Sequence, residues 1–232
     1  MEKRFYVCPS TDPISPAEEN FEEKLIEYSR ELASSGADFL HCDIMDGKFV
    51  ERSTFGAGLL EKLNASTTIP LDVHLMTRYS KKELKKYVNA GANILTVHVE
   101  NFIKNGKLKT CGLVRVIKYL HKNDCLVGVS LKPKTELEIL RPVLELIDLV
   151  LVMSVEPGKS GQEFLKESFG RIEKLDKIRT EKQYKFLIEV DGGVNLDNLS
   201  KLKELNVDMV VSGNFIFKSE NKKEIIKKLK NI

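Results

Sequence analysis

Short runs rich in β-branched and aliphatic residues recur along this chain, separated by stretches with helical periodicity. We expect strands at about residues 4–9, 38–44, 71–76, 93–99, 126–132, 149–155, 186–191 and 209–213. Eight units in 232 residues give roughly 29 residues per unit, as a compact (β/α)8 barrel requires. The regular repeat and the absence of a linker favour one barrel domain over residues 1–232 rather than an open, doubly wound sheet.

The segments between the strands carry apolar residues at helical spacing. Before the first of these segments, the sequence SPAE predicts a helix start with Ser15 as N-cap, Pro16 at the first helical position and Glu18 closing a capping box. The lysine-rich carboxyl-terminal segment reads as a docked helix rather than a basic tail. The predicted buried faces are Phe21, Leu25, Tyr28 and Leu32; Leu113, Val116, Ile117 and Leu120; and Ile225, Ile226 and Leu229.

Composition and charge restrict the partners that the chain can have. The net charge is only +3 and lysine alternates with glutamate along the chain, so nothing indicates nucleic acid or an acidic membrane surface as a partner. No apolar run has the length of a membrane span or a signal peptide. The four cysteines show no C-x-x-C spacing, which predicts free thiols in the cytoplasm. Assembly into a homo-oligomer is compatible with this composition.

Ligand-type residues interrupt three predicted strands near their carboxyl ends, where barrels of this class gather their chemistry. Alternation along a strand places His41 and Asp43 on one side, and His74 and Asp191 come from other strands at the same level. A lone histidine at a strand end is more often a hydrogen-bonded core residue, but four such residues together favour a metal site. We therefore expect one divalent ion, which could be zinc, iron(II), manganese or cobalt.

Other histidine and cysteine residues receive lesser roles. His98 lies near a strand end, where packing or support of a ligand is the default interpretation. His121 falls on a predicted helix and is expected at the surface, whereas alternation turns Cys42 away from the barrel axis. Met45, Met76 and Met153 close three strands at similar heights. Methionine usually fills gaps in a core, but the three together could form a water-excluding wall of an active site.

Glycine-rich segments follow the last three predicted strands. The GKS in EPGKSGQ (156–162) does not belong to a phosphate-binding P-loop, because Met153 stands where that motif needs glycine. The segment suits instead a mobile loop that closes on an anionic substrate. DGG (191–193) and SGN (212–214) lie where such barrels usually bind phosphate. Ordinary tight turns are the alternative explanation for each glycine taken alone.

Seven segments together resemble the ribulose-phosphate 3-epimerases in order and spacing along nearly the whole chain. They are CPS, HCDIMDGKFV, LDVHLM, GANILTVHVE, VMSVEPGKSGQ, IEVDGGVN and VVSGN. The resemblance implies a (β/α)8 barrel that interconverts D-ribulose 5-phosphate and D-xylulose 5-phosphate in the pentose phosphate pathway. It implies that Asp43 and Asp191 exchange protons with carbon 3 through an enediolate, and that both bind the metal together with His41 and His74.

The resemblance also implies positions that contact the substrate. The expected contacts are Ser10, His74, Asp191, a closing loop of Gly158, Lys159, Ser160 and Gly161, and a phosphate site of Gly192, Gly193, Gly213 and Asn214. This chain departs from the family at Glu156, Lys159, Ser160 and Asn214 and in the loop GKFVERS (47–53). None of these departures removes an expected metal ligand, but they alter the walls and the lid of the site.

Three alternatives follow from these departures. An epimerase of a six-carbon ketose phosphate, such as D-allulose 6-phosphate, is the nearest, although DVHLM and DGGV favour the pentose. A related lyase would need the pattern D-x-K-x-x-D, which DIMDG and DVHLM lack. A barrel that only binds a sugar phosphate is disfavoured by the intact set of two histidines and two aspartates.

Overall fold

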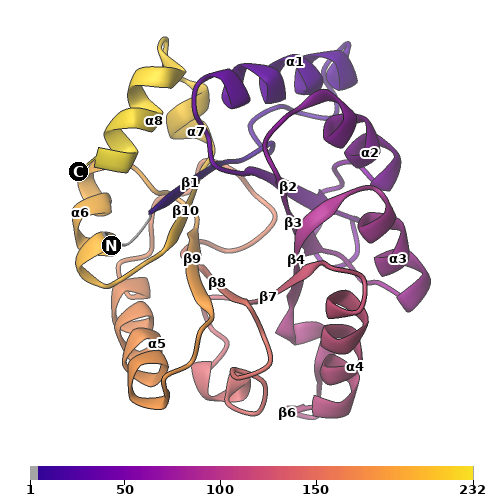
Figure 1. Cartoon of the computed structure of the whole chain (residues 1–232), viewed down its shortest axis with the longest axis vertical. Coiled ribbons are helices and arrows are strands. Elements are labelled where there is room, and N and C mark those ends of the chain that lie inside the picture. The colour runs from indigo at the N-terminus through magenta and orange to yellow at the C-terminus, as the bar shows by residue number, and fades with distance from the viewer. Residues whose placement is uncertain (1–4, 232) are drawn as a thin grey trace.

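Eight parallel strands surround a central axis in the computed structural model, which describes residues 5–231 (Figure 1). The strands are β1 (Tyr6–Pro9), β2 (Leu40–Met45), β3 (Leu71–Met76), β4 (Ala92–His98), β7 (Leu126–Leu131), β8 (Leu149–Met153), β9 (Leu187–Asp191) and β10 (Met209–Ser212). They pair in the order β1-β10-β9-β8-β7-β4-β3-β2. A bridge between Ser10 and His41 joins β1 to β2 and closes the ring. The prediction of a (β/α)8 barrel is confirmed; Arg4, expected in the first strand, lies outside the described residues.

Helices form the outer layer and cover the strands. They are α1 (Phe21–Ser34), α2 (Ala57–Ser66), α3 (Lys81–Asn89), α4 (Thr110–His121), α5 (Ser168–Lys182), α6 (Leu196–Glu204), α7 (Asn214–Phe217) and α8 (Lys222–Asn231). Leu25 and Leu32 of α1, Leu113 of α4 and Leu229 of α8 are fully buried in the main hydrophobic core, so the predicted apolar faces are confirmed. Strands covered by such a layer are apolar toward the helices, and their inward positions are free to carry the site.

The predicted start of the first helix at Ser15 is wrong. The helix begins at Phe21, after Asn20 adopts a left-handed conformation with φ 57°. Residues 15–18 form a separate turn, in which the Ser15 N–H donates to Glu18 Oε1 at 2.9 Å and the Glu18 N–H donates to the Ser15 carbonyl at 3.0 Å. Only the Glu18 half of the predicted capping box is therefore present, and the left-handed Asn20 separates it from the helix.

The connection from β7 to β8 differs from the expected strand–helix repeat. Residues 132–148 contain only a short 3-10 helix, η2 (Leu137–Leu140). The other 3-10 helix, η1 (Val99–Phe102), directly follows β4. Pro142 comes two residues after Leu140, where a longer α-helix would need a backbone N–H donor. Leu140 and Val143 are nevertheless fully buried, so turns cover this part of the barrel in place of a helix.

A small hairpin of β5 (Ile103–Lys104) and β6 (Lys107–Leu108) was not predicted. Its turn residues, Asn105 and Gly106, both have positive φ, at 50° and 70°. An Asn-Gly pair of this kind is a strong hairpin signal, and it was present in the sequence.

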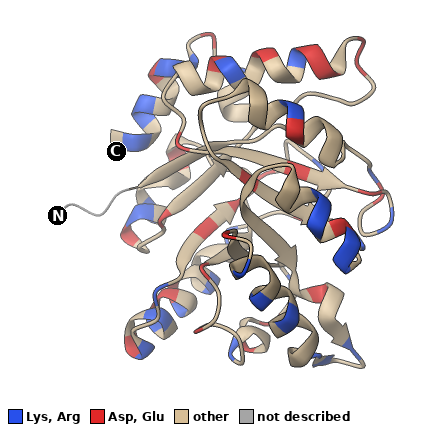
Figure 2. Ribbon diagram, turned by 45° about the vertical axis from the view of Figure 1, so that its right-hand side comes forward, with Lys and Arg blue, Asp and Glu red and all other residues tan. Residues whose placement is uncertain are grey.

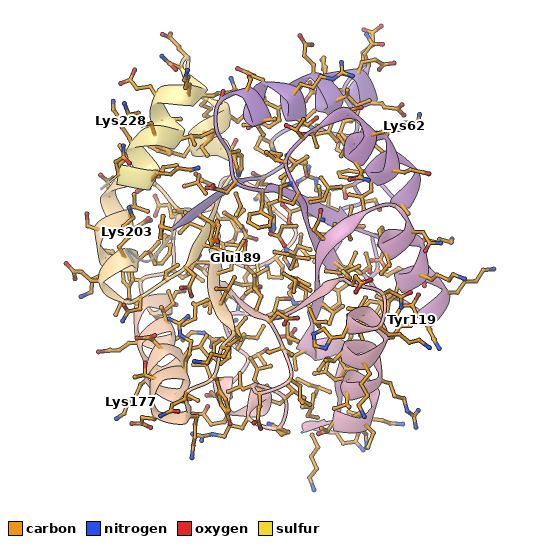
Figure 3. All side chains as sticks on the ribbon, viewed as in Figure 1. Lys62, Tyr119, Lys177, Glu189, Lys203 and Lys228 are labelled. Carbon is orange, nitrogen blue, oxygen red and sulfur yellow. The ribbon has the colours of Figure 1, made fainter. Side chains whose placement is uncertain are left out.

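Charged side chains divide between the two layers. Lysine and arginine lie mainly on the outer helices and loops, whereas acidic positions also occur along the strands (Figure 2). The side chain of Glu189 lies near the centre of the barrel, while Lys62, Lys177 and Lys228 point outward (Figure 3). Within residues 5–231, no helix combines the length and apolar character that a membrane span needs.

Candidate active site

Alternation along three strands directs polar residues into the barrel interior, and all of them are buried except the half-buried Asp191. His41 and Asp43 come from β2, Asp72 and His74 from β3, and Glu189 and Asp191 from β9. Cys42 points the other way and packs in the core between strands and helices, as predicted. The four residues proposed from the sequence meet: ligand atoms of His41, Asp43, His74 and Asp191 all lie within 4.8 Å of one another.

The distances within this group identify the atoms that face its centre. Asp43 Oδ1 lies 3.4 Å from His41 Nε2 and 3.1 Å from His74 Nδ1, and Asp191 Oδ2 lies 3.8 Å from the same His74 nitrogen. His41 Nε2 is fully buried and has no hydrogen-bond partner. A buried ring nitrogen left unpaired beside two carboxylates is costly unless it binds something. Two imidazoles and two carboxylates fit a divalent transition metal.

A second pair of buried carboxylates stands behind His41. Its Nδ1 lies 2.5 Å from Asp72 Oδ2 and 3.8 Å from Glu189 Oε1. We did not single out Asp72 or Glu189 from the sequence. Each precedes a proposed ligand by two residues, so the alternation that selected His41 and Asp43 also indicated them.

His74 is backed by a different set of groups. Its Nε2 lies 3.0 Å from His98 Nε2, and His98 Nδ1 lies 3.1 Å from Glu100 Oε2. Burial lowers the pKa of His98 to about 4. For Glu100, burial alone would raise the pKa, but the hydrogen bond and charge of His98 and the hydrogen bonds from Thr135 and Lys132 together outweigh it and lower the pKa to about 2. His98 thus supports a proposed ligand, in line with its default interpretation.

The two aspartates of the site differ in their affinity for protons. Burial raises the pKa of Asp191 to about 7, and the Asp43 carboxylate adds to the effect. Burial acts in the same direction on Asp43, but His41 and His74 outweigh it and hold its pKa well below the usual range. Carboxyls whose surroundings separate their pKa values in this way are suited to opposite roles in proton transfer.

Ser10 joins the end of β1 to the Asp43 carboxylate. Its hydroxyl donates to Asp43 Oδ2 at 2.6 Å and accepts from the Asp12 N–H at 2.9 Å. Asp12, not predicted from the sequence, lines the cavity and pairs with Arg52 Nη1 at 2.5 Å. Burial, followed by the charge of Asp43, raises the pKa of Asp12 to about 6.

A cavity of about 440 Å³ opens above this group at the carboxyl ends of the strands. All three methionines proposed as a wall line it, and Lys218, which sequence reasoning missed, also borders it. The loop after β8 and the turns after β9 and β10 complete its walls. Their lining residues include Gly158, Lys159, Ser160, Gly161, Gly192, Gly193, Gly213 and Asn214.

The loop after β8 lies against the turns that follow β9 and β10. Asn214 Nδ2 donates to Ser160 Oγ at 2.8 Å, linking this loop to the turn after β10. Gly193 has φ +65°, and a Cβ there would lie 2.5 Å from the Phe164 backbone nitrogen. Glycine at 193 is therefore required by the close approach of the loop, a reason that the sequence did not reveal.

His121, expected at the surface, is exposed at the end of α4 and pairs with Asp148 at 2.7 Å.

Similarity to known proteins agrees with this geometry. A Treponema pallidum protein named ribulose-phosphate 3-epimerase is 36% identical over 217 residues, covering 94% of this chain and 93% of its own length. A chloroplastic ribulose-5-phosphate-3-epimerase of Arabidopsis thaliana is 36% identical over 207 residues, covering 89% of this chain and 72% of its own length.

Solved structures with little sequence identity share the fold. The KGPDC structure from Streptococcus mutans aligns with a TM-score of 0.66 at 13% identity, covering 99% of this chain and 97% of that one. This likeness concerns the barrel alone. The model of the ribulose-phosphate 3-epimerase family matches residues 14–217, and this chain belongs to that family.

Proposed function

We propose that this protein is a metal-dependent epimerase that inverts carbon 3 of D-ribulose 5-phosphate to give D-xylulose 5-phosphate. The observation that carries the proposal is the meeting of Asp43 and Asp191, which both line one cavity, with the buried His41 and His74. Family membership and the names of the relatives support the same activity. They give no support to a six-carbon substrate or to a barrel that only binds sugar phosphates.

Inversion at carbon 3 needs two groups that exchange protons with opposite faces of that carbon. In the proposed mechanism one aspartate takes the proton of carbon 3, next to the carbon-2 ketone, and the electron pair moves onto the ketone oxygen to form an enediolate. The other aspartate then protonates carbon 3 from the opposite face. Asp43, held ionised by His41 and His74, is suited to act as base, and Asp191 as acid; the roles exchange in the reverse direction.

His41, Asp43, His74 and Asp191 would hold one divalent ion. When bound, the ion would supply Lewis-acid stabilisation of the negative charge that develops on the substrate oxygens. The unpaired Nε2 of His41 supports this assignment. Zinc, iron(II), manganese and cobalt all suit this mixture of nitrogen and oxygen ligands.

The remaining lining residues would contact different parts of the substrate. Met45, Met76 and Met153 would form its apolar wall beside the reacting carbon and keep water from the intermediate. Gly192, Gly193, Gly213 and Asn214 would receive the phosphate, with Lys159 and Ser160 on the loop that covers it and Lys218 adding positive charge at the border. Ser10 would orient Asp43 through the hydrogen bond to its Oδ2.

A side-by-side assay tests the proposal. The purified protein should epimerise D-ribulose 5-phosphate much faster than D-allulose 6-phosphate or free D-ribulose, and it should lose activity on exhaustive chelation and regain it with a divalent transition metal. Retention of full activity after chelation would contradict the metal, equal rates with free ribulose would contradict the phosphate site, and faster turnover of the hexose phosphate would contradict the substrate.

A cytoplasmic location is part of the proposal. All four cysteines are free thiols, which supports a reducing compartment. The expected partner is a small ketose phosphate, and the modest net charge of +3 offers no basis for binding nucleic acid.

A further inference from the structure

Glu100 stands at the far end of a line of hydrogen-bonding groups that leads into the proposed metal site. Its Oε1 accepts from the Lys132 N–H at 2.8 Å and from Thr135 Oγ1 at 2.5 Å. Its other oxygen faces His98 Nδ1 at 3.1 Å. An ionised carboxylate can only accept. His98 Nδ1 must therefore carry the hydrogen in this contact.

The next contact in the line is between two imidazoles. His98 has no exposed surface and packs against the Phe49 ring, with centroids 4.6 Å apart. Complete burial disfavours a second proton on this ring, so the ring is neutral and its Nε2 has a free lone pair. That nitrogen lies 3.0 Å from His74 Nε2. His74 Nε2 must then carry the hydrogen.

The direction of these hydrogen bonds decides what His74 presents to the cavity. With a hydrogen held on Nε2, Nδ1 is the nitrogen that faces Asp43 and Asp191 at 3.1 and 3.8 Å, and a metal ion bound there has to displace only the hydrogen shared with Asp43. The opposite order would leave Nε2 without a hydrogen and make the Nδ1 hydrogen, directed at Asp43, the only one on the ring. It would also leave the His98 Nδ1 lone pair against the Glu100 carboxylate at 3.1 Å. Because the Glu100 carboxylate can only accept a hydrogen bond, this opposite order is excluded.

We infer that Glu100 is a positioning residue that acts through His98 to hold His74 in the tautomer able to bind a metal through Nδ1. The inference deepens the proposed function and rests on the proposed metal site. It differs from the support given to His41, whose Nδ1 meets the Asp72 carboxylate directly at 2.5 Å. Hydrogen bonds behind a ligating histidine typically contribute about 10–100-fold in metal affinity.

Glu100→Gln is a sharp test because the structure fixes the orientation of the new amide. The Lys132 backbone N–H can only donate, so the amide oxygen keeps the position of Oε1 and the NH2 group faces His98 Nδ1. That donor reverses the line: His98 then donates from Nε2 and His74 carries its hydrogen on Nδ1. A substitution of nearly identical shape should therefore change the tautomer of a residue that it does not touch.

Two measurements read the result, and neither needs the catalysed reaction. The chain has only four histidines, so 15N NMR of the ring nitrogens can identify the His74 tautomer in the metal-free protein. The dissociation constant for Co²⁺ is measured by competition with a chelator. We expect Glu100→Gln to remove the hydrogen from Nε2, leaving His74 with its hydrogen on Nδ1, and to weaken Co²⁺ binding by about 10–100-fold. Glu136→Gln, an exposed change of the same charge on the neighbouring loop, should change neither.

A double variant separates this role from a simple effect of charge. His98→Phe breaks the line, so adding Glu100→Gln to it should produce no further loss of Co²⁺ affinity. An additional loss in that background, or an unchanged tautomer and affinity in Glu100→Gln alone, would overturn the inference. Failure of the parent protein to bind Co²⁺, Mn²⁺ or Zn²⁺ would instead refute the proposed metal site, while the tautomer measurement would still decide the role of Glu100.

Discussion

Two sets of inward-facing side chains in the same barrel, here called the polar side and the apolar side, are chemically opposite. The polar side consists of the polar residues that β2, β3 and β9 contribute to the site, whereas the apolar side comes mainly from β8 and β10, the strands that flank β9. On the polar side, His41 Nε2, Asp72 Oδ1 and both carboxylate oxygens of Glu189 have no hydrogen-bond partner. On the apolar side, Leu149, Leu151, Met153, Met209 and Val211 pack into one cluster. Burial alone therefore does not distinguish a site from a core; what marks the site is that several unsatisfied buried polar atoms lie close together.

The largest expected effect comes from removing a proton carrier on the polar side. Asp43→Asn and Asp191→Asn keep the shape of the side chain but cannot accept and return a proton, so each should lower kcat by about 10²–10⁴-fold. Met153→Leu, on the apolar side, should change kcat by far less. Metal content is measured in parallel, and near-parental turnover by either metal-loaded asparagine variant would refute the two-base mechanism.

On the apolar side the corresponding loss should appear in stability. Leu151 is fully buried in the interior cluster, and Leu151→Ala should lower the free energy of unfolding by about 2–5 kcal/mol through lost contacts and a cavity. Urea unfolding measures this value. The affinity of the folded variant for Co²⁺ should stay close to that of the parent, and a large loss of affinity would mean that the two sides are not separate.

A smaller effect is expected from the carboxylate behind His41. Asp72→Asn can donate to His41 Nδ1 and favour a hydrogen on Nε2, the nitrogen that faces Asp43. Metal affinity should fall by about 10–100-fold, as measured by chelator competition. Asp176→Asn, on the outer helix α5, serves as a charge-matched control. Unchanged affinity in Asp72→Asn would indicate that Asp72 does not control the tautomer of His41.

The smallest effect concerns Asp12 and depends on pH. Its pKa rises from 3.8 in the unfolded chain to about 6 in the fold, so the folded state binds this proton more tightly. The stabilisation this gives is present below about pH 4 and is lost as the pH rises to about 6. Relative to the parent, metal-free Asp12→Asn should therefore gain on the order of 1–3 kcal/mol between pH 4 and 7. Urea unfolding at both pH values checks this; a constant difference would contradict it.

Alternation and strand-end position were sufficient to predict the barrel and the meeting of His41, Asp43, His74 and Asp191. The same rule could have found Asp72 and Glu189. Glu100 could not be placed by it, because η1 follows β4 and ends the strand periodicity. Asp12 and Lys218 reach the cavity from loop and helix ends, where no period relates residue number to direction. The connection from β7 to β8 contains a 3-10 helix instead of an α-helix. A prediction based on the strand–helix repeat overlooks the effect of Pro142, which cannot donate a backbone hydrogen bond.

The closing seam of the barrel has a consequence for the order of folding. β1 pairs with β10, placing Tyr6 beside Met209, and this contact joins segments at nearly opposite ends of the described chain. Contacts of such high sequence separation carry a large loop-closure cost and form slowly. During synthesis, the edge of β1 that pairs with β10 has no partner strand until β10 has left the ribosome. The β1–β10 contacts, including the hydrogen bond from the Ser10 N–H to the Ser212 carbonyl at 3.4 Å, can therefore form only after β10 has been synthesised.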